Sequence, residues 1–221
     1  MTNLTDFLLT RDFPDDRIQS YYKNQPYTIG EYRTVIPELE SKLKELNIPA
    51  NASALLVLDD SLIAVSFFLA CIRYGIIPIL ASSFTMDGAI DRIIEAADLT
   101  LLVSDGSRDL SQFKNRVILA ELTGDARPGH AVLSLTNDPA DIQHKHIDAS
   151  ELAFFLTTSG STGLPKIVKH LHSGMIFATR TYGVETLKVT ADDRIYSIAK
   201  TSFGYGLFNN LTSRRLWSLA A

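Results

Sequence analysis

The sequence has a single cysteine, Cys71, and no segment typical of an exported or membrane-bound protein. One thiol cannot build an intramolecular disulfide framework, which fits a reducing compartment. Residues 1–16 lack a basic region followed by an apolar core, so no signal peptide is evident. The apolar run from Ser61 to Ile72 is too short to span a bilayer. We therefore expect a cytoplasmic protein without a membrane partner, and we expect Cys71, inside that run, to be a buried structural thiol.

The sequence also lacks an excess of basic residues. Its net charge is −4, and Lys and Arg are scattered along the chain. A nucleic-acid partner would normally require a basic patch, so we expect none. With 221 residues, 46% of them hydrophobic, the chain can bury a substantial core in one large domain or two small ones.

Short apolar runs alternate with helix-length segments. Thr28 and Glu31 have the spacing of a capping box that begins a helix, which Pro37 should kink or delay. Gly75 is placed to end a second helix, Thr85 could cap a third, and Pro78 suits an edge strand or a bulge. The runs of strand length are 54–58, 76–80, 99–103, 116–122 and 153–156. The pattern predicts an α/β fold: a doubly wound, mainly parallel sheet with flanking helices. We interpret residues 1–20 as an N-terminal extension and 123–150 as a long surface connection.

The stretch TTSGSTGLPK follows the last apolar run and predicts a phosphate-binding loop. Its glycines let backbone amides approach an anion, its hydroxyls can donate to phosphate oxygens, and its lysine adds a compact positive charge. The predicted ligands are Thr157, Thr158, Ser159, Gly160, Ser161, Thr162, Gly163 and Lys166. A strand leads into the loop, so it should emerge at a sheet edge, where α/β folds bind ligands.

The spacing of this loop differs from two common nucleotide-binding patterns. A Walker A loop places its lysine directly after a glycine and follows it with Ser or Thr, whereas Lys166 stands three residues after Gly163 and precedes Ile167. The Rossmann pattern G-x-G-x-x-G is absent as well. A flexible linker with an incidental lysine is disfavoured, because Pro165 stiffens the loop and strands flank it.

TTSGSTGLPK closely resembles the phosphate-binding signature of the acyl-adenylate-forming superfamily, which includes acyl- and aryl-CoA synthetases. The resemblance extends from about residue 20 to 210, through YTIGEYRTVIPELESKLKELNI and SALLVLDDSLIAVSFFLACIRYGIIPILAS. It departs at Ile167, where the family usually has glycine, which should alter the turn into the next strand. Enzymes of the family are more than twice as long, so residues 1–221 correspond to the N-terminal part of an adenylation domain.

The resemblance implies an acid–thiol ligase. A small carboxylic acid would attack the α-phosphorus of ATP, and the thiol of coenzyme A or of a phosphopantetheine would then displace AMP. It further implies Mg²⁺ as a cofactor, Lys166 as the catalytic residue, and a carrier protein or the missing C-terminal portion as a partner.

A second segment, AKTSFGYGL (199–207), is similar to the part of benzoate- and other aryl-CoA ligases that lines the acid pocket. It implies substrate contacts from Lys200, Phe203, Tyr205 and Gly206, because an aromatic ring beside glycine forms a slot for a planar acid. Two alternatives stay open: the aromatics could be core residues, and Lys200 could be a solvated surface lysine.

Other polar residues are assigned structural roles. Asp59 and Asp60 should cap the helix after the first strand of the sheet. His170 and His172 have the spacing of metal ligands on a strand, but nothing nearby completes a set, and we predict no metal ligands. Two rival functions remain: a non-catalytic nucleotide-binding or interaction module that keeps the fold, and an unrelated NTPase with a variant phosphate loop.

Overall fold

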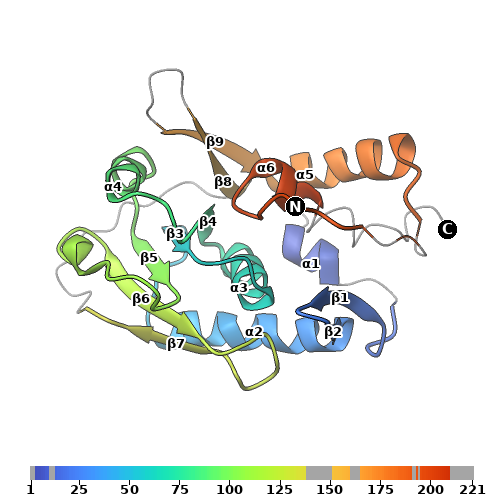
Figure 1. The fold of residues 1–221 in the computed structure, drawn as a ribbon, viewed down its shortest axis with the longest axis horizontal. Helices are drawn as coiled ribbons and strands as arrows, with labels where there is room; N and C mark the ends of the chain where they lie inside the picture. Colours follow the sequence, from blue (N-terminus) through green and yellow to red (C-terminus); the bar gives the residue numbers. More distant parts are fainter. Residues whose placement is uncertain are drawn as a thin grey trace.

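The computed structural model describes residues 3–9, 13–137, 151–159, 165–190, 193 and 195–209. Its centre is a seven-stranded sheet with the order β7-β6-β5-β3-β4-β8-β9 (Figure 1). Five strands are parallel: β3 (Ser53–Val57), β4 (Ile77–Ala81), β5 (Leu101–Ser104), β6 (Ile118–Thr123) and β8 (Leu152–Ser159). The edge strands β7 (Val132–Leu135) and β9 (Pro165–Leu171) are antiparallel to their neighbours. The predicted doubly wound, mainly parallel α/β sheet is confirmed.

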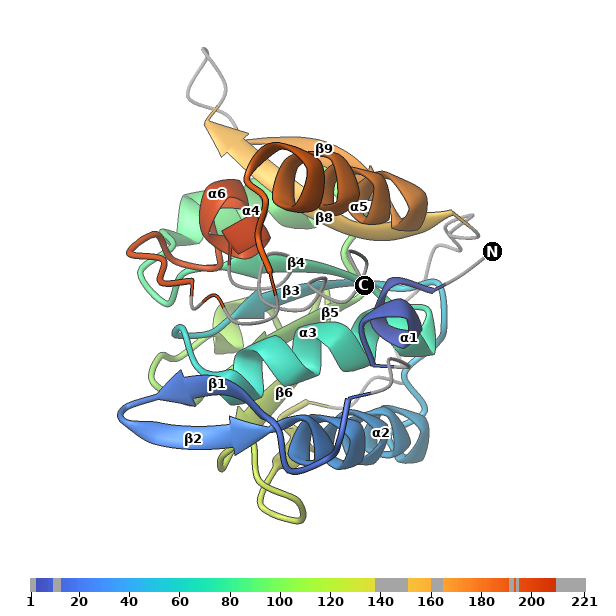
Figure 2. The same cartoon turned by 90° about the vertical axis from the view of Figure 1, so that its right-hand side faces the viewer.

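Helices cover both faces of the sheet (Figure 2). One face carries α1 (Leu4–Leu9), α2 (Ile29–Glu45), α3 (Leu62–Tyr74) and α5 (His172–Ala178), which continues into the π-helical segment η3 (Thr179–Thr186). The other face carries α4 (Asp87–Ala96) and the short 3₁₀ helix η1 (Ser111–Phe113). In β3, Leu56 packs into the core on the α3 side, whereas Leu55 and Val57 pack on the α4 side. Burial on both faces explains why the parallel strands read as unbroken apolar runs.

The boundaries of α2 and α3 follow local chemistry. The Thr28 hydroxyl accepts from the Glu31 amide at 3.2 Å, and the Glu31 carboxylate accepts from the Thr28 amide at 2.7 Å, which confirms the capping box. Pro37 does not delay the start of α2, because the helix begins at Ile29 and continues through Pro37 to Glu45. Gly75 ends α3 with a φ of +96°, the left-handed conformation that glycine adopts most readily.

Two predictions about single residues are wrong. Pro78 lies in a central strand, β4, and not at an edge, and β4 pairs with β3 there without a bulge. The Ile77 amide donates to the Ala52 carbonyl, on the side of β3. The backbone nitrogen of the next residue, Pro78, therefore points toward β8, and β4 pairs with β8 only through Ile79 and Phe155. The missing amide is therefore tolerated. Thr85 caps no helix, because α4 begins at Asp87 after Met86.

Two segments predicted to lie outside the core architecture contribute to it. Residues 1–20 include α1, whose Leu4 and Leu8 are buried, and the start of β1 (Ile18–Tyr22), which pairs with β2 (Gln25–Thr28). The predicted connection 123–150 contains β7, which pairs with β6 through Leu133 and Leu122. Polar residues and a turn around Gly129 conceal this short strand in the sequence. The part of the connection from 138 to 150 lies outside the described residues.

Candidate active site

The carboxyl ends of the parallel strands meet at one edge of the sheet. From β3 the chain first passes to β4 on one side, and from β4 it crosses back to β5 on the other side of β3. Such a reversal opens a crevice beyond the carboxyl ends of the strands, where α/β folds bind ligands. The predicted phosphate loop follows β8, so it leaves the sheet at this edge, as expected.

The two ends of the predicted loop form the antiparallel hairpin β8–β9 (Figure 1). Thr158 is paired with Lys166, Thr157 with Ile167, and Ser159 with Pro165. Thr158 and Lys166 are exposed, and Lys166 has no hydrogen-bond or ion-pair partner among the residues that the structure describes. The remaining predicted ligands, Gly160, Ser161, Thr162 and Gly163, lie outside the described residues.

The alternation of side chains assigns the hairpin residues to two faces. Leu156 of β8 and His170 of β9 face the α5 side, so Thr158 and Lys166 lie on that side too. Thr157 and its partner Ile167 face the opposite side, where Ile167 packs against the core beneath α4. Ile167 is therefore a regular residue of β9, which already begins at Pro165.

The short helix α6 (Gly204–Leu207) covers the same face of the hairpin as Lys166. A Cβ atom added to Gly204 would lie 3.2 Å from Leu156 Cδ1, so the helix backbone sits against β8. The Phe208 ring meets the His170 ring edge-on at 6.2 Å, and His170 stacks on Phe154 at 4.8 Å. Burial holds the pKa of His170 below its usual value. The structure thus brings together the two segments singled out in the sequence.

The segment 199–207 folds into a tight loop that presents its aromatic rings to solvent. The Phe203 amide donates to the Lys200 carbonyl at 3.0 Å, and Leu207 is fully buried. At Gly206 an added Cβ would lie 2.0 Å from the Lys200 oxygen, so only glycine fits there. Phe203 and Tyr205 are 64% and 72% exposed, which rules them out as core residues.

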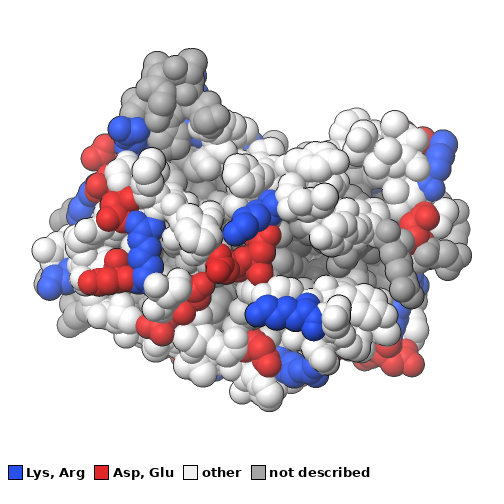
Figure 3. All heavy atoms as spheres, in the orientation of Figure 1, with Lys and Arg blue, Asp and Glu red and all other residues white. Residues whose placement is uncertain are grey.

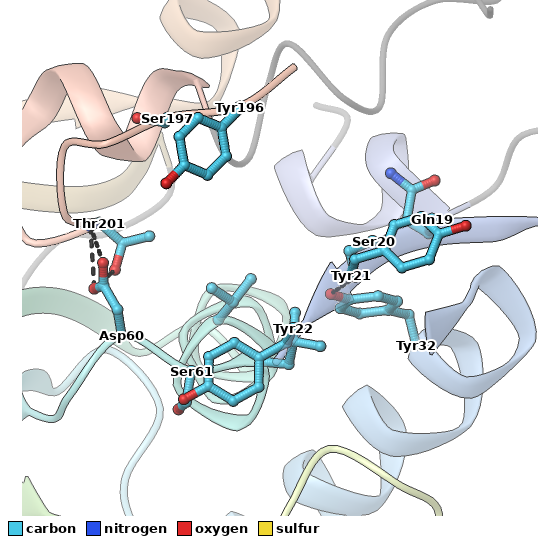
Figure 4. Close-up of a pocket in the computed structure, with 12 residues that line it drawn as sticks. Gln19, Ser20, Tyr21, Tyr22, Tyr32, Asp60, Ser61, Tyr196, Ser197 and Thr201 are labelled. Carbon is cyan, nitrogen blue, oxygen red and sulfur yellow. Dashed lines mark hydrogen bonds between the residues drawn. The ribbon is translucent and has the colours of Figure 1, made fainter. Parts of the chain in front are cut away.

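Asp59 and Asp60, which follow β3 after Leu58, bind other segments of the carboxyl edge. Both Asp60 carboxylate oxygens accept from the Thr201 amide at 3.1 Å, and one also accepts from the Thr201 hydroxyl at 2.5 Å (Figure 4). Asp59 accepts from the Ser83 hydroxyl at 2.5 Å and lies 3.9 Å from the Lys200 ammonium group. The prediction that the two aspartates cap α3 is wrong, because Ser61 caps it.

Lys200 is neither buried nor isolated. Its ammonium group lies 5.3 Å from the centre of the Phe84 ring, in addition to its ion pair with Asp59. Acidic and basic side chains are interspersed over the face shown in Figure 3, and the described residues form no continuous basic patch there. The Lys200 ammonium group is thus held between the Asp59 carboxylate and the Phe84 ring.

A cavity of about 200 Å³ lies between β1 and the segment 196–201. Tyrosine rings from three parts of the chain line it, and the Asp60–Thr201 contact forms part of its wall (Figure 4). The four tyrosines are Tyr21, Tyr22, Tyr32 and Tyr196. Tyr196 is 83% exposed, so the cavity is open on that side.

His172 has a structural role at the start of α5. It is buried, and its Nδ1 accepts from the Leu4 amide at 3.1 Å, which ties α1 to α5. Burial lowers the pKa of His172, against a smaller opposing effect of Asp6. The described residues contain no group of three or more His, Cys, Asp or Glu that could hold a metal ion.

A doubly wound sheet with a hydroxyl- and glycine-rich loop at its carboxyl edge is typical of nucleotide-binding α/β domains. The sequence matches the model of the family described as AMP-binding enzyme over residues 10–214. The chain belongs to this family. None of the helices in the described part of the chain is long and apolar enough to cross a membrane.

Curated relatives agree with this assignment, and solved structures share the fold. The anthranilate–CoA ligase of Pseudomonas aeruginosa is 33% identical over 220 residues, covering 96% of this chain and 41% of the relative. A 4-hydroxybenzoate/benzoate–CoA ligase of Rhodopseudomonas palustris is 28% identical over 193 residues, covering 81% of this chain and 34% of the relative. The O-succinylbenzoate CoA synthetase of Bacillus subtilis in complex with AMP shares the fold, with a TM-score of 0.76 and 18% identity over 97% of this chain and 53% of that one. The same protein is also known with ATP and a magnesium ion. The chain therefore spans less than half the length of the curated relatives it matches.

Proposed function

We propose that the chain is the N-terminal part of an AMP-forming acid–thiol ligase of the aryl- or acyl-CoA synthetase branch. In the first half-reaction a carboxylate oxygen attacks the α-phosphorus of ATP, which yields an acyl-adenylate and pyrophosphate. In the second half-reaction a thiol sulfur attacks the acyl carbon, which yields a thioester and AMP. The thiol belongs to coenzyme A or to a carrier protein's phosphopantetheine.

One observation carries the proposal. The hairpin β8–β9 places Thr158 beside Lys166 on the face that α6 covers, at the carboxyl edge of the sheet. The proposed phosphate-binding residues and the loop 199–207, which is proposed to bind the acid, therefore lie on the same side of one strand pair. An enzyme that joins a carboxylate to a nucleotide phosphate needs both within reach of one reacting atom.

The phosphate end of this site uses hydroxyls, amides and one cation. Lys166 would counter the charge of the β- and γ-phosphates, and the Thr158 hydroxyl would donate to them. Thr157 and Ser159 would support the loop, whose residues Gly160, Ser161, Thr162 and Gly163 would supply further amides and hydroxyls. The exposed ammonium group of Lys166 and the oxygen-rich loop fit a nucleotide that arrives with Mg²⁺, which would neutralise phosphate charge when bound.

The acid end uses the loop 199–207. Phe203 and Tyr205 would hold a planar acid beside Gly206, and Lys200 would attract its carboxylate. The relatives that act on anthranilate and benzoates support an aromatic acid as the substrate. The Pseudomonas and Rhodopseudomonas relatives are CoA ligases, which supports coenzyme A as the acceptor.

The test is exchange of labelled pyrophosphate into ATP by the full-length gene product, with benzoate, anthranilate and acetate as candidate acids. We expect exchange that depends on an added acid. Lys166→Ala should slow it about 100-fold, by the loss of a charge contact to the transferring group. Lys169→Ala is the matched control, because it removes the same charge from the same strand on the opposite face.

The outcomes separate the proposal from its rivals. ATP hydrolysis that no acid affects, without pyrophosphate exchange, would favour an NTPase. Binding of ATP with no exchange for any acid would favour a non-catalytic nucleotide-binding module. Equal rates for Lys166→Ala and Lys169→Ala would refute the assignment of Lys166.

A further inference from the structure

We propose that Asp60 is a positioning residue for acid binding and acts through Thr201. The inference rests on the proposed function and adds to it a residue that neither touches the acid nor belongs to the phosphate loop. Asp60 fixes the base of the loop 199–207, and this loop presents the aromatic slot.

The contact between the two residues uses both donors of Thr201. The Thr201 amide donates to both carboxylate oxygens of Asp60 at 3.1 Å, and the hydroxyl donates to one of them at 2.5 Å (Figure 4). Thr201 is only 6% exposed, so these donors are sheltered from water. Hydrogen bonds to a charged acceptor are stronger than neutral ones, and a buried donor that loses its partner is costly.

Asp60 itself lies between a buried strand and a capped helix. It stands between β3, whose residues are all buried, and Ser61, whose hydroxyl caps α3 by accepting from the Ala64 amide at 3.2 Å. A carboxylate beside the N-terminus of this 13-residue helix is favoured by the helix dipole. The position of the carboxylate is therefore set by the core of the sheet.

Thr201 connects Asp60 to the residues of the proposed aromatic slot. Phe203, Tyr205 and Gly206 follow it within five residues, and Gly206 rests against the carbonyls of Ala199 and Lys200. The loop is closed on itself, with its base held by Asp60 and its other end held by the buried Leu207. Phe203 and Tyr205 project into solvent with few neighbours of their own, and the Asp60–Thr201 contact takes the place of local packing in orienting them.

The neighbouring ion pair cannot replace this contact. Lys200 and Asp59 are about half exposed and 3.9 Å apart, and such surface pairs contribute little. Asp60, rather than Asp59, thus holds the base of the loop 199–207, and its substitution should affect the loop.

The experiment compares four variants of the full-length gene product: Asp60→Asn, Thr201→Val, Thr201→Ser and Asp91→Asn. Thr201→Val nearly keeps the shape of the side chain but loses the hydroxyl, whereas Thr201→Ser keeps the donor. Asp91→Asn removes one carboxylate from α4 on the other face of the sheet and controls for charge. The assay is pyrophosphate exchange with whichever of benzoate, anthranilate or acetate the wild type uses fastest.

We expect Asp60→Asn and Thr201→Val to raise KM for the acid about tenfold, as for the loss of one hydrogen bond to a charged group. KM for ATP should change less than twofold, because the phosphate loop lies on β8–β9. Thr201→Ser and Asp91→Asn should behave like the wild type. Amide hydrogen exchange over 199–207 should be faster in Asp60→Asn and unchanged in Asp91→Asn.

A wild-type acid KM in Asp60→Asn and Thr201→Val overturns the inference, as does an equal rise in KM for acid and ATP. Failure of the proposed function has a different signature, namely a wild type without acid-dependent exchange. Faster hydrogen exchange over 199–207 with an unchanged acid KM also overturns the inference, since the loop would then be anchored without affecting the acid.

Discussion

Substitution of Gly206 by alanine tests the geometry of the loop 199–207 independently of activity. An added Cβ would lie 2.0 Å from the Lys200 carbonyl oxygen and 2.4 Å from that of Ala199. Both contacts are with backbone, which cannot rotate away as a flexible side chain can, so the loop must open by more than an ångström. Opening it disturbs Leu207, which is fully buried in the main core.

The expected cost follows from two opposing effects. Overpacking a close contact costs roughly 1–3 kcal/mol, and this contact lies at the severe end of that range. Alanine gains about 1 kcal/mol over glycine inside a helix, which offsets part of the cost. The net expectation for Gly206→Ala is a loss of about 2 kcal/mol in the free energy of unfolding.

Gly174→Ala in α5 is the matched control. An added Cβ there meets nothing within 4 Å, so only the gain in helix propensity remains. It should raise stability by up to about 1 kcal/mol. Urea unfolding of the chain followed by circular dichroism measures both variants. If Gly206→Ala proves as stable as Gly174→Ala, the described packing of α6 against residues 199–200 is refuted.

Three further predictions concern the scaffold. His172 has a lowered pKa when folded, so below about pH 6.5 the unfolded chain takes up the proton first. The free energy of unfolding should therefore fall as the pH drops from about 6.5 toward the folded pKa. His172→Asn keeps a hydrogen-bond acceptor and should weaken this pH dependence, measured by urea unfolding at several pH values. An equal pH dependence in the wild type and the variant would contradict the prediction. Thr28→Ala should cost about 1 kcal/mol by removing the capping box, measured by urea unfolding, and no loss would count against that cap. Cys71 is fully buried and burial raises its pKa, so a thiol reagent should label it only at the rate of unfolding; rapid labelling of the folded chain would contradict its placement.

The architecture was predictable because the parallel strands are buried on both faces. Each appears as a short apolar run, and the segments between them have helical length, so alternation alone defines a doubly wound sheet. The capping box at Thr28 and the glycine at 75 were predictable for a related reason, since both depend on residues adjacent in the chain. The strand β7 was missed because an edge strand has one exposed side and no continuous apolar run: Val132 and Ser134 face solvent.

The candidate site was only partly predictable. The loop that ends at Lys166 follows from composition and spacing, whereas the pairing of Lys166 with Thr158 requires the register of the hairpin. Asp60 was assigned to a cap because Asp before a helix usually is one. Its partner, Thr201, is 141 residues away, and no local pattern signals such a contact. The available signal was its place at the carboxyl end of a buried parallel strand, where ligand-binding residues gather.

The central claim is that one site joins the hairpin β8–β9 to the loop 199–207. Hydrogen–deuterium exchange of the full-length gene product tests it directly, with and without a hydrolysis-resistant acyl-adenylate analogue of anthranilate. We predict that the analogue protects residues 152–159, 165–171 and 199–208 together, and that AMP alone leaves 199–208 unprotected. Tight binding of the analogue with protection of only one of these segments, or of neither, would contradict the account.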